Sequence, residues 1–259
     1  MKRPKGIILY EGPSMFDGKK IIVIANTFGN SNNNRKTGKM IQTWILRADI
    51  DPILAAKNGE DYSICGNCKH RDFNSCYVNK GFGPRNVYYA YLRGTYVPFT
   101  DDYIQYFKGY YIRIGSYGDP AAVPIEVWDN IYNITNGQTS YTHQWQLKKY
   151  QKFKKYCMTS VDTVAEYRQA IDLGWRTFRI RTSVNDTIFH TEFICPASNE
   201  NNHKKTCITC GACCGGSNGI TPCIIVHGGG VMGWKIRNFI NGIKKIKNHK
   251  KWRKYLKIT

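Results

Sequence analysis

The chain has 259 residues, of which 42% are hydrophobic and 14% aromatic, a composition that excludes intrinsic disorder and a fold that depends on disulfides. Its formal net charge of +20 favours a polyanionic partner, nucleic acid first, over a merely soluble basic protein. The N-terminal apolar run is too short for a signal peptide and no apolar run reaches about 18 residues, so we expect no membrane partner and a reducing cytoplasm.

The first predicted elements are two strands separated by a polar segment. Residues 19–28 form a continuous β-branched run that is typical of a buried strand, and residues 41–49 are predicted as the next strand. The segment 29–40 between them lacks the Walker pattern, because Asn33 and Met40 stand where Gly and Ser or Thr are required. A phosphate-binding loop is therefore not expected there.

A cysteine-bearing loop follows at residues 63–79. It contains Cys65, Cys68 and Cys76, with His70 between them. Three thiolates can hold a metal cluster that keeps one open coordination position, or a zinc ion that takes His70 as its fourth ligand. Both interpretations stay open, since an open position suits catalysis and a closed Cys3His site would be structural.

Strands and helices then alternate along the middle of the chain. The predicted elements are a strand within 109–124, a helix at 124–136, a strand at 139–146, a strand within 154–163, a helix at 164–174 capped by Ser160 or Asp162, and a strand at 175–183. Strand–helix–strand units of this length favour a parallel, right-handed arrangement. We therefore predict an α/β fold, with an incomplete (β/α) barrel-like domain over residues 1–190 into which the cysteine loop is inserted.

Several residues that could act in catalysis or bind a cofactor follow the predicted strand ends, where barrel proteins have their active sites. Asp119 and His143 are the candidate catalytic residues. Gly118, Asp119, Pro120 and Ser160 are the candidate cofactor-binding residues. The alternatives are an ordinary turn at Gly118–Pro120 and a satisfied core histidine at His143.

Three arginines lie inside the apolar strands, at Arg113, Arg179 and Arg181. An unpaired buried charge is costly, so each must face solvent, a carboxylate or an anionic ligand. Cys157 also lies on a predicted strand, and we expect it in the core.

Residues 191–233 are rich in Cys, Gly, Ser and Asn, which predicts a metal-stapled extension. Its candidate metal ligands are Cys195, Cys207, Cys210 and Cys213. The compact C-x2-C-x2-C run favours iron–sulfur, whereas the long first gap favours a zinc ribbon. Cys214 and Cys223 are possible substitutes, and unrelated buried thiols are the alternative.

Residues 234–259 are predicted as a basic amphipathic helix. Its apolar stripe, expected to dock on the body, comprises Ile236, Phe239, Ile240, Ile243 and Ile246. Its candidate nucleic-acid-binding residues are Lys244, Lys245, Lys247, Lys250, Lys251, Arg253 and Lys254, with Trp252 and Tyr255 available to stack on bases. The alternative is a solvated helix that binds nothing.

Several stretches together resemble a family of cysteine-rich bacteriophage proteins. They are "GPSMFDGKKIIVIA", "KTGKMIQTWILR", "SICGNC" with "CYVN", "YIRIGSYGDPAAVP", "YTHQW", "MTSVDTVAEYRQAIDLGWRTFRI", "CPAS" and "TCITCGACCGG". The resemblance covers most of the chain. It implies the cytoplasm of a bacterial host as the place of action.

A more distant similarity is to the radical S-adenosylmethionine enzymes, which have a cysteine-rich loop, a barrel and a Gly-Gly-Glu-Pro-like strand end that receives the methionyl amine. The resemblance implies that Cys65, Cys68 and Cys76 would hold the catalytic four-iron cluster and that Gly118–Pro120 would form the amine site. It also implies an auxiliary cluster on the C-terminal cysteines. The spacing here is C-x2-C-x7-C rather than C-x3-C-x2-C, and Asp119 replaces the Glu.

The sequence thus predicts a metal-cluster protein, with iron–sulfur or zinc, that acts on or binds nucleic acid. If it is an enzyme, S-adenosylmethionine is the expected cofactor. The alternative is a non-catalytic, zinc-stapled protein that binds nucleic acid or the ribosome.

Overall fold

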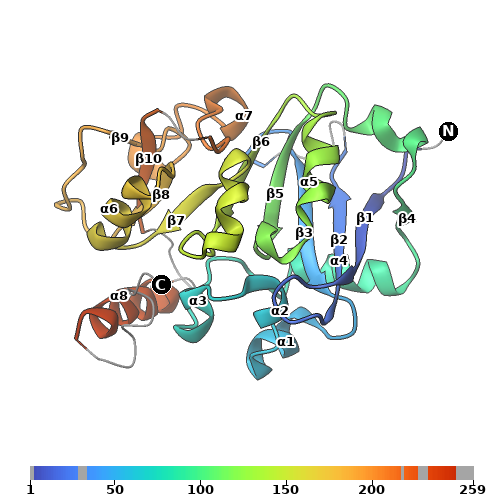
Figure 1. The fold of residues 1–259 in the computed structure, drawn as a ribbon, viewed down its shortest axis with the longest axis horizontal. Helices are drawn as coiled ribbons and strands as arrows, with labels where there is room; N and C mark the ends of the chain where they lie inside the picture. The colour runs from blue at the N-terminus through green and yellow to red at the C-terminus, as the bar shows by residue number, and fades with distance from the viewer. Residues whose placement is uncertain (1–2, 29–33, 217–218, 227–232, 249–259) are drawn as a thin grey trace.

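The structure is a computed structural model that describes residues 3–28, 34–216, 219–226 and 233–248 (Figure 1). Its centre is one mixed sheet of ten strands in the order β4-β1-β2-β3-β5-β6-β7-β8-β10-β9. The strands are β1 (Gly6–Pro13), β2 (Lys20–Asn26), β3 (Ile41–Arg47), β4 (Val97–Pro98), β5 (Tyr111–Tyr117), β6 (Gly137–Thr142), β7 (Met158–Val161), β8 (Thr177–Arg181), β9 (Glu192–Ile194) and β10 (Thr221–Ile225).

Helices cover the sheet and carry the candidate site. They are α1 (Pro52–Asn58), α2 (Tyr62–Cys65), α3 (Lys69–Asp72), α4 (Gly83–Leu92), α5 (Ile125–Tyr132), α6 (Val164–Asp172), α7 (Cys207–Cys210) and α8 (Gly233–Asn248). Short 3-10 helices are η2 (Asp101–Tyr106), η3 (Pro120–Ala122), η4 (Lys148–Lys155) and η5 (Asn199–Asn201).

The sheet combines an antiparallel and a parallel part. The strands β1, β2 and β3 pair in antiparallel fashion, whereas neighbours from β3 through β5, β6, β7, β8 and β10 to β9 are parallel. In β2, the residues Ile21 to Ala25 have no exposed surface, as expected of a central strand that is covered on both faces. Because the strands from β3 to β9 are parallel, their carboxyl ends meet at one edge of the sheet, which we call the carboxyl edge.

The α/β prediction is confirmed, and the sheet is open. A closed barrel of the parallel strands would require β3 to pair with β9, the strand at the other end of the parallel run. Instead β2 occupies the free side of β3, and β9 forms the edge of the sheet beside β10. The cysteine-rich segment 191–233 thus supplies two strands to the main sheet.

Buried aromatic residues fix the helices against the sheet. Trp128 of α5 and Trp175 before β8 are at most 1% exposed. The Trp128 Nε1 atom donates a hydrogen bond of 2.9 Å to the Pro120 carbonyl, so α5 also anchors the loop that follows β5. The cap of α6 differs from the prediction, because Thr163 accepts the hydrogen bond from the Glu166 amide.

The C-terminal helix α8 lies beside α3 (Figure 1). Phe239 and Ile243 of the predicted apolar stripe pack against Phe73 of the segment after α3, with Ile240 beside them, whereas the Ile246 side chain lies outside the described residues. Lys244 and Lys245 are exposed. The Lys247 side chain lies outside the described residues. So does the segment 249–259, which contains the other predicted nucleic-acid-binding residues, Lys250, Lys251, Arg253 and Lys254. No helix in the described ranges combines the length and apolar character needed to span a membrane.

Candidate functional site

The cysteine loop is attached to the carboxyl edge of the sheet, next to the end of β5. The Asp119 amide donates a hydrogen bond of 2.6 Å to the carbonyl of Ile64 in α2. The Gln144 Nε2 atom donates to the Cys65 carbonyl at 3.1 Å and lies 3.4 Å from Asp119 Oδ2. The loop that bears Cys65 and the strand-end loop at Asp119 are therefore direct neighbours.

Two glycines allow this close approach. Gly66 and Gly118 both have positive φ, 52° and 85°, a region that side chains rarely adopt. A Cβ atom on Gly66 would lie 2.8 Å from the Gln144 side chain, and one on Gly118 would lie 2.6 Å from the Ile45 Cβ atom. A larger residue at Gly66 would push the cysteine loop away from Gln144, and one at Gly118 would push the strand-end loop away from β3.

Asp119 organises the carboxyl edge. Its carboxylate accepts hydrogen bonds from the Ala121 amide at 3.0 Å, the Thr142 hydroxyl at 2.8 Å and the His143 amide at 2.8 Å. Burial raises the pKa of Asp119 to about 6, although these donors oppose the rise. The residue predicted to be catalytic therefore ties the ends of β5 and β6 together.

The three cysteines of the loop are half-buried. Burial raises the pKa of Cys65 and of Cys68 well above the ordinary value, and neighbouring thiols raise both further. Cys76 is one of those neighbours. The Tyr117 hydroxyl, next to Cys65 and Cys76, is buried and has no hydrogen-bond partner among the described residues. Such thiols stay protonated until a cation displaces the proton.

The spacing of the thiols decides which metal centre they suit. A zinc ion with Zn–S bonds near 2.3 Å needs its sulfurs about 3.8 Å apart. In the described chain, the group of three ligands whose atoms all lie within 4.8 Å of one another comprises His70, His143 and Asp162, and no cysteine belongs to such a group. Cysteines that hold a four-iron cluster bind different irons and stand further apart, so thiols at a wider spacing are compatible with a cluster.

His70 does not join the three thiols. Its Nδ1 atom lies 2.8 Å from the Ser75 hydroxyl, and its Nε2 atom lies 3.3 Å from Asp162 Oδ2. The Nζ atom of Lys69 lies 2.8 Å from Asp162 Oδ2 and 2.5 Å from Glu166 Oε1. Burial opposes ionisation of Asp162, but Lys69 and His70 lower its pKa below the ordinary value.

His143 follows β6 and faces this group. Its ring lies 5.4 Å from the His70 ring in an edge-on arrangement. Burial, with a contribution from His70, lowers the pKa of His143 to about 3, so the imidazole is neutral at physiological pH. Sequence reasoning placed His143 at the edge but missed Lys69, Asp162 and Glu166 as site residues. Ser160, which it named instead, lies within β7 rather than after it.

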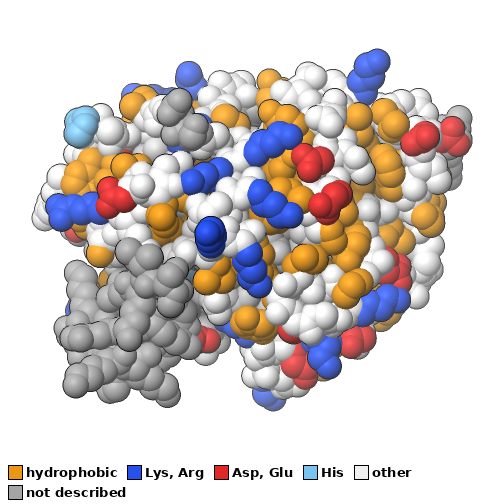
Figure 2. Space-filling view, in the orientation of Figure 1, with side chains coloured by type: hydrophobic (Ala, Val, Ile, Leu, Met, Phe, Trp, Pro, Cys, Tyr) orange, Lys and Arg blue, Asp and Glu red, His pale blue; other side chains and the backbone are white. Residues whose placement is uncertain are grey.

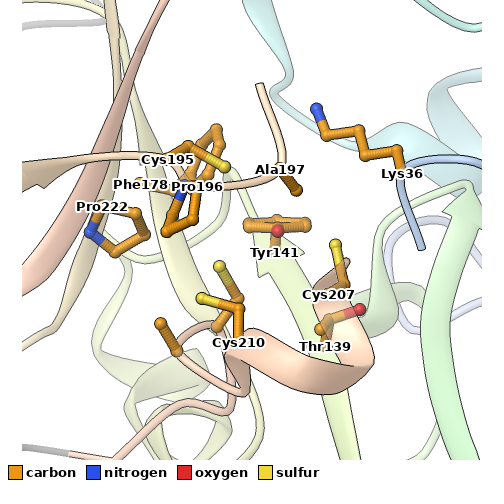
Figure 3. A pocket seen from close by; sticks show the side chains of 12 residues that line it. Lys36, Thr139, Tyr141, Phe178, Cys195, Pro196, Ala197, Cys207, Cys210 and Pro222 are labelled. Atoms are coloured by element: carbon orange, nitrogen blue, oxygen red, sulfur yellow. The ribbon is translucent and has the colours of Figure 1, made fainter. Parts of the chain in front are cut away.

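The four C-terminal cysteines converge at a second place. Figure 3 shows Cys195, Cys207 and Cys210 around the ring of Tyr141, and Cys213 lines the same cavity of about 20 Å³. Burial raises the pKa of Cys213 to about 12.

The remaining cysteines lie apart from this cavity. Cys214 is exposed, and Cys223 is buried within β10. Cys157 is in the core as expected, with its sulfur 3.1 Å from the Ser140 hydroxyl.

Arg113 connects the two cysteine groups. Its Nη2 atom donates a hydrogen bond of 2.8 Å to the Tyr77 hydroxyl, and Tyr77 directly follows Cys76. The guanidinium lies 5.7 Å from the centre of the Tyr141 ring. Burial raises the pKa of Cys207, and the nearby Arg113 opposes that rise.

The other two strand arginines are paired with carboxylates. Arg179 bonds Glu192 at 2.7 and 2.6 Å, and Arg181 bonds Glu200. Arg113, in contrast, has no carboxylate partner among the described residues, and its positive charge is available to the thiols.

A basic surface lies on η4, whose last two residues overlap the start of the strand predicted within residues 154–163. Lys148, Lys149 and Lys152 are exposed, whereas Lys155 pairs with Asp129 at 3.1 Å. Figure 2 shows Lys and Arg side chains gathered on the face between α5 and α6. The lysine-rich run of residues 148–155 was visible in the sequence and could have indicated this surface.

Comparison of the chain with protein-family models, with curated proteins and with solved structures yields no match. The fold and the site alone therefore define its class, an open mixed α/β-sheet protein with two cysteine groups.

Proposed function

We propose that this protein is an iron–sulfur protein that acts on nucleic acid, with its cluster held by Cys65, Cys68 and Cys76. The observation that carries the proposal is the 2.6 Å hydrogen bond from the Asp119 amide to the Ile64 carbonyl, which holds the thiol loop against the Gly118–Pro120 loop. A cluster with three protein ligands keeps one iron free for an exogenous ligand.

The order of elements supports chemistry of the radical S-adenosylmethionine type. The thiol loop follows β3, the first strand of the parallel run, and Gly118–Pro120 follows β5, the second. When bound, a cluster of this kind supplies one electron to a ligand on its free iron. Gly118–Pro120 would receive the amine of S-adenosylmethionine, and the buried Asp119 holds that loop in place. The proposal includes an open sheet that curves as a partial barrel.

The second cysteine group serves as a structural metal centre in this proposal. Cys195, Cys207, Cys210 and Cys213 line one cavity next to Arg113, whose positive charge offsets that of bound thiolates. All ten cysteines are free, as metal ligation in a reducing bacterial cytoplasm would require.

Nucleic acid is the proposed partner. Five exposed lysines of η4 and α8 have no carboxylate partner among the described residues: Lys148, Lys149, Lys152, Lys244 and Lys245. Phosphate contacts of this kind supply most of the sequence-independent affinity for nucleic acid. A bacteriophage origin would place that partner in the host cytoplasm.

The second candidate is a non-catalytic, zinc-stapled protein that binds nucleic acid or the ribosome. It is favoured by the gathering of four C-terminal cysteines around one small cavity, since four thiolates are the ligand number of a structural zinc site.

The test is reductive cleavage of S-adenosylmethionine by the anaerobically purified protein in the presence of dithionite. The proposal predicts formation of 5′-deoxyadenosine by the wild-type chain. It also predicts none from C65S/C68S/C76S, and full formation by C214S, which changes an exposed cysteine outside both groups. An iron-loaded wild-type protein that forms none would favour the non-catalytic candidate.

A further inference from the structure

We propose that His70, His143 and Asp162 bind one divalent transition-metal ion, at a site distinct from both cysteine groups. The three residues come from separate segments: α3, the end of β6 and the end of β7. One ligand atom from each lies within 4.8 Å of the others. The inference goes beyond the proposed function and does not require an iron–sulfur cluster.

The His70 ring is held in the orientation that a ligand needs. Its Nδ1 atom is engaged by the Ser75 hydroxyl at 2.8 Å, which leaves Nε2 directed at Asp162. The ring also stacks on Phe239 of α8, with ring centres 5.4 Å apart and an interplanar angle of 19°. Metal-binding histidines characteristically have the second ring nitrogen fixed in this way.

Two ligand atoms lack partners. The Nε2 atom of His143 and the Oδ1 atom of Asp162 are buried, and neither has a hydrogen-bond partner among the described residues. A buried polar atom without a partner costs about 1–3 kcal/mol, so such atoms in a folded protein call for an explanation. A metal ion between them would accept both lone pairs.

The local charge also favours a cation. Lys69 carries one positive charge and lies between the carboxylates of Asp162 and Glu166, so the buried trio has a net charge of −1. An ion-pair network in which His70 supplies the missing positive charge is the rival explanation. That network leaves the His143 Nε2 atom without a partner, whereas a metal ion would both balance the negative charge and bind this nitrogen.

The donor set selects the class of metal. Two imidazole nitrogens and one carboxylate oxygen are typical of zinc and of non-haem ferrous iron, and they are poor ligands for calcium or magnesium. Three protein ligands leave at least one position for water or a substrate atom. The ion would lie near Cys68, because Asp162 is one of the charges that raise the pKa of that thiol.

The test uses the full chain with C65S/C68S/C76S, so that zinc cannot bind the first thiol group. Zinc stoichiometry and affinity are measured by chelator competition in this background and after adding H143Q. The matched control adds H190Q, which changes an exposed histidine. Circular dichroism establishes that each variant is folded.

Besides the metal held by the C-terminal thiols, we expect the background protein to bind one further zinc ion, which the H143Q variant binds at least about 10-fold more weakly and the H190Q variant retains. The part of the cobalt spectrum that H143Q removes should consist of visible bands without thiolate charge-transfer absorption, and the absorption of the C-terminal group should stay unchanged. Equal zinc binding by the H143Q and H190Q variants would overturn the inference and leave the ion-pair network. Either result leaves the iron–sulfur proposal untouched, because the first thiol group is absent from the assay.

Discussion

The Nη2 atom of Arg113 lies 2.8 Å from the hydroxyl of Tyr77, and through this contact one side chain adjoins both cysteine groups. Tyr77 follows Cys76 of the first group, while the same guanidinium opposes the burial-induced rise in the pKa of Cys207 in the second. The two candidate metal centres therefore share one positive charge.

Replacing Arg113 by Met should weaken metal binding at the C-terminal group by about 10-fold, because thiolates lose a nearby positive charge. Chelator competition at neutral pH measures the change. The control is Y77F, which removes the hydrogen bond but keeps the charge, and it should bind metal nearly as tightly as wild type. Equal losses in the two variants would show that geometry rather than charge matters here.

The exposed lysines of η4 should contribute to phosphate binding. Changing Lys148, Lys149 and Lys152 to Glu should reduce the slope of log affinity against log salt for duplex DNA by about 2.7, since each phosphate contact adds about 0.9. Fluorescence anisotropy at several salt concentrations measures the slope.

The matched control for the η4 variant has the same change in charge at three exposed lysines elsewhere, Lys19, Lys57 and Lys108. Its slope should change much less than that of the η4 variant. Two equal slopes would mean that the partner responds only to net charge.

Asp119 should make stability depend on pH. Burial raises its pKa from the ordinary 3.8 to about 6, so the folded chain holds this proton more tightly than the unfolded chain. The stability that this group contributes is full below pH 3.8 and is lost as the pH rises through 6, by about 3 kcal/mol in all. Urea unfolding of the metal-free protein at pH 4 and pH 7 measures it.

In D119N this titration is absent, so the stability advantage of wild type over the variant should shrink between pH 4 and pH 7. D102N, at an exposed carboxylate, corrects for the loss of one acidic group. A constant difference between wild type and D119N across this range would contradict the assigned environment of Asp119.

The docking of α8 depends on a glycine, because a side chain at that position would collide with Phe73. A Cβ atom on Gly242 would lie 2.3 Å from the Phe73 ring, whereas one on Gly233 would meet no atom within 4 Å. Alanine in a helix normally stabilises by up to about 1 kcal/mol relative to glycine, but overpacking costs about 1–3 kcal/mol.

Limited proteolysis should therefore release α8 faster from G242A than from wild type, and G233A should be cleaved no faster than wild type. If G242A resists cleavage as well as G233A does, α8 is not held by its contact with Phe73.

The parallel order of the central strands could be predicted from the sequence because it follows from local pattern. Strand runs alternate with helical runs between residues 109 and 183, and such units place their carboxyl ends together. The thiol loop follows β3, the first strand of the parallel run, and the 2.6 Å contact between the Asp119 amide and the Ile64 carbonyl places it at the same edge as Asp119.

Long-range pairing could not be predicted in this way. The short strands β9 and β10 come from a segment whose Cys, Gly and Ser content indicates a loop, and their place in the sheet depends on pairing with β8. Lys69 and Glu166 are 97 residues apart, and no periodicity connects them. The direction of His70, away from the thiols, is likewise set by Ser75 and Asp162 in three dimensions.

The most direct test of the central claim is the iron and acid-labile sulfide content of the anaerobically purified chain, compared between wild type and C65S/C68S/C76S. We predict that the wild-type protein is brown and that the triple variant contains about four fewer irons and four fewer sulfides per chain. C214S should keep the wild-type content. A triple variant with unchanged iron, or a colourless wild-type protein with stoichiometric zinc, would contradict the account.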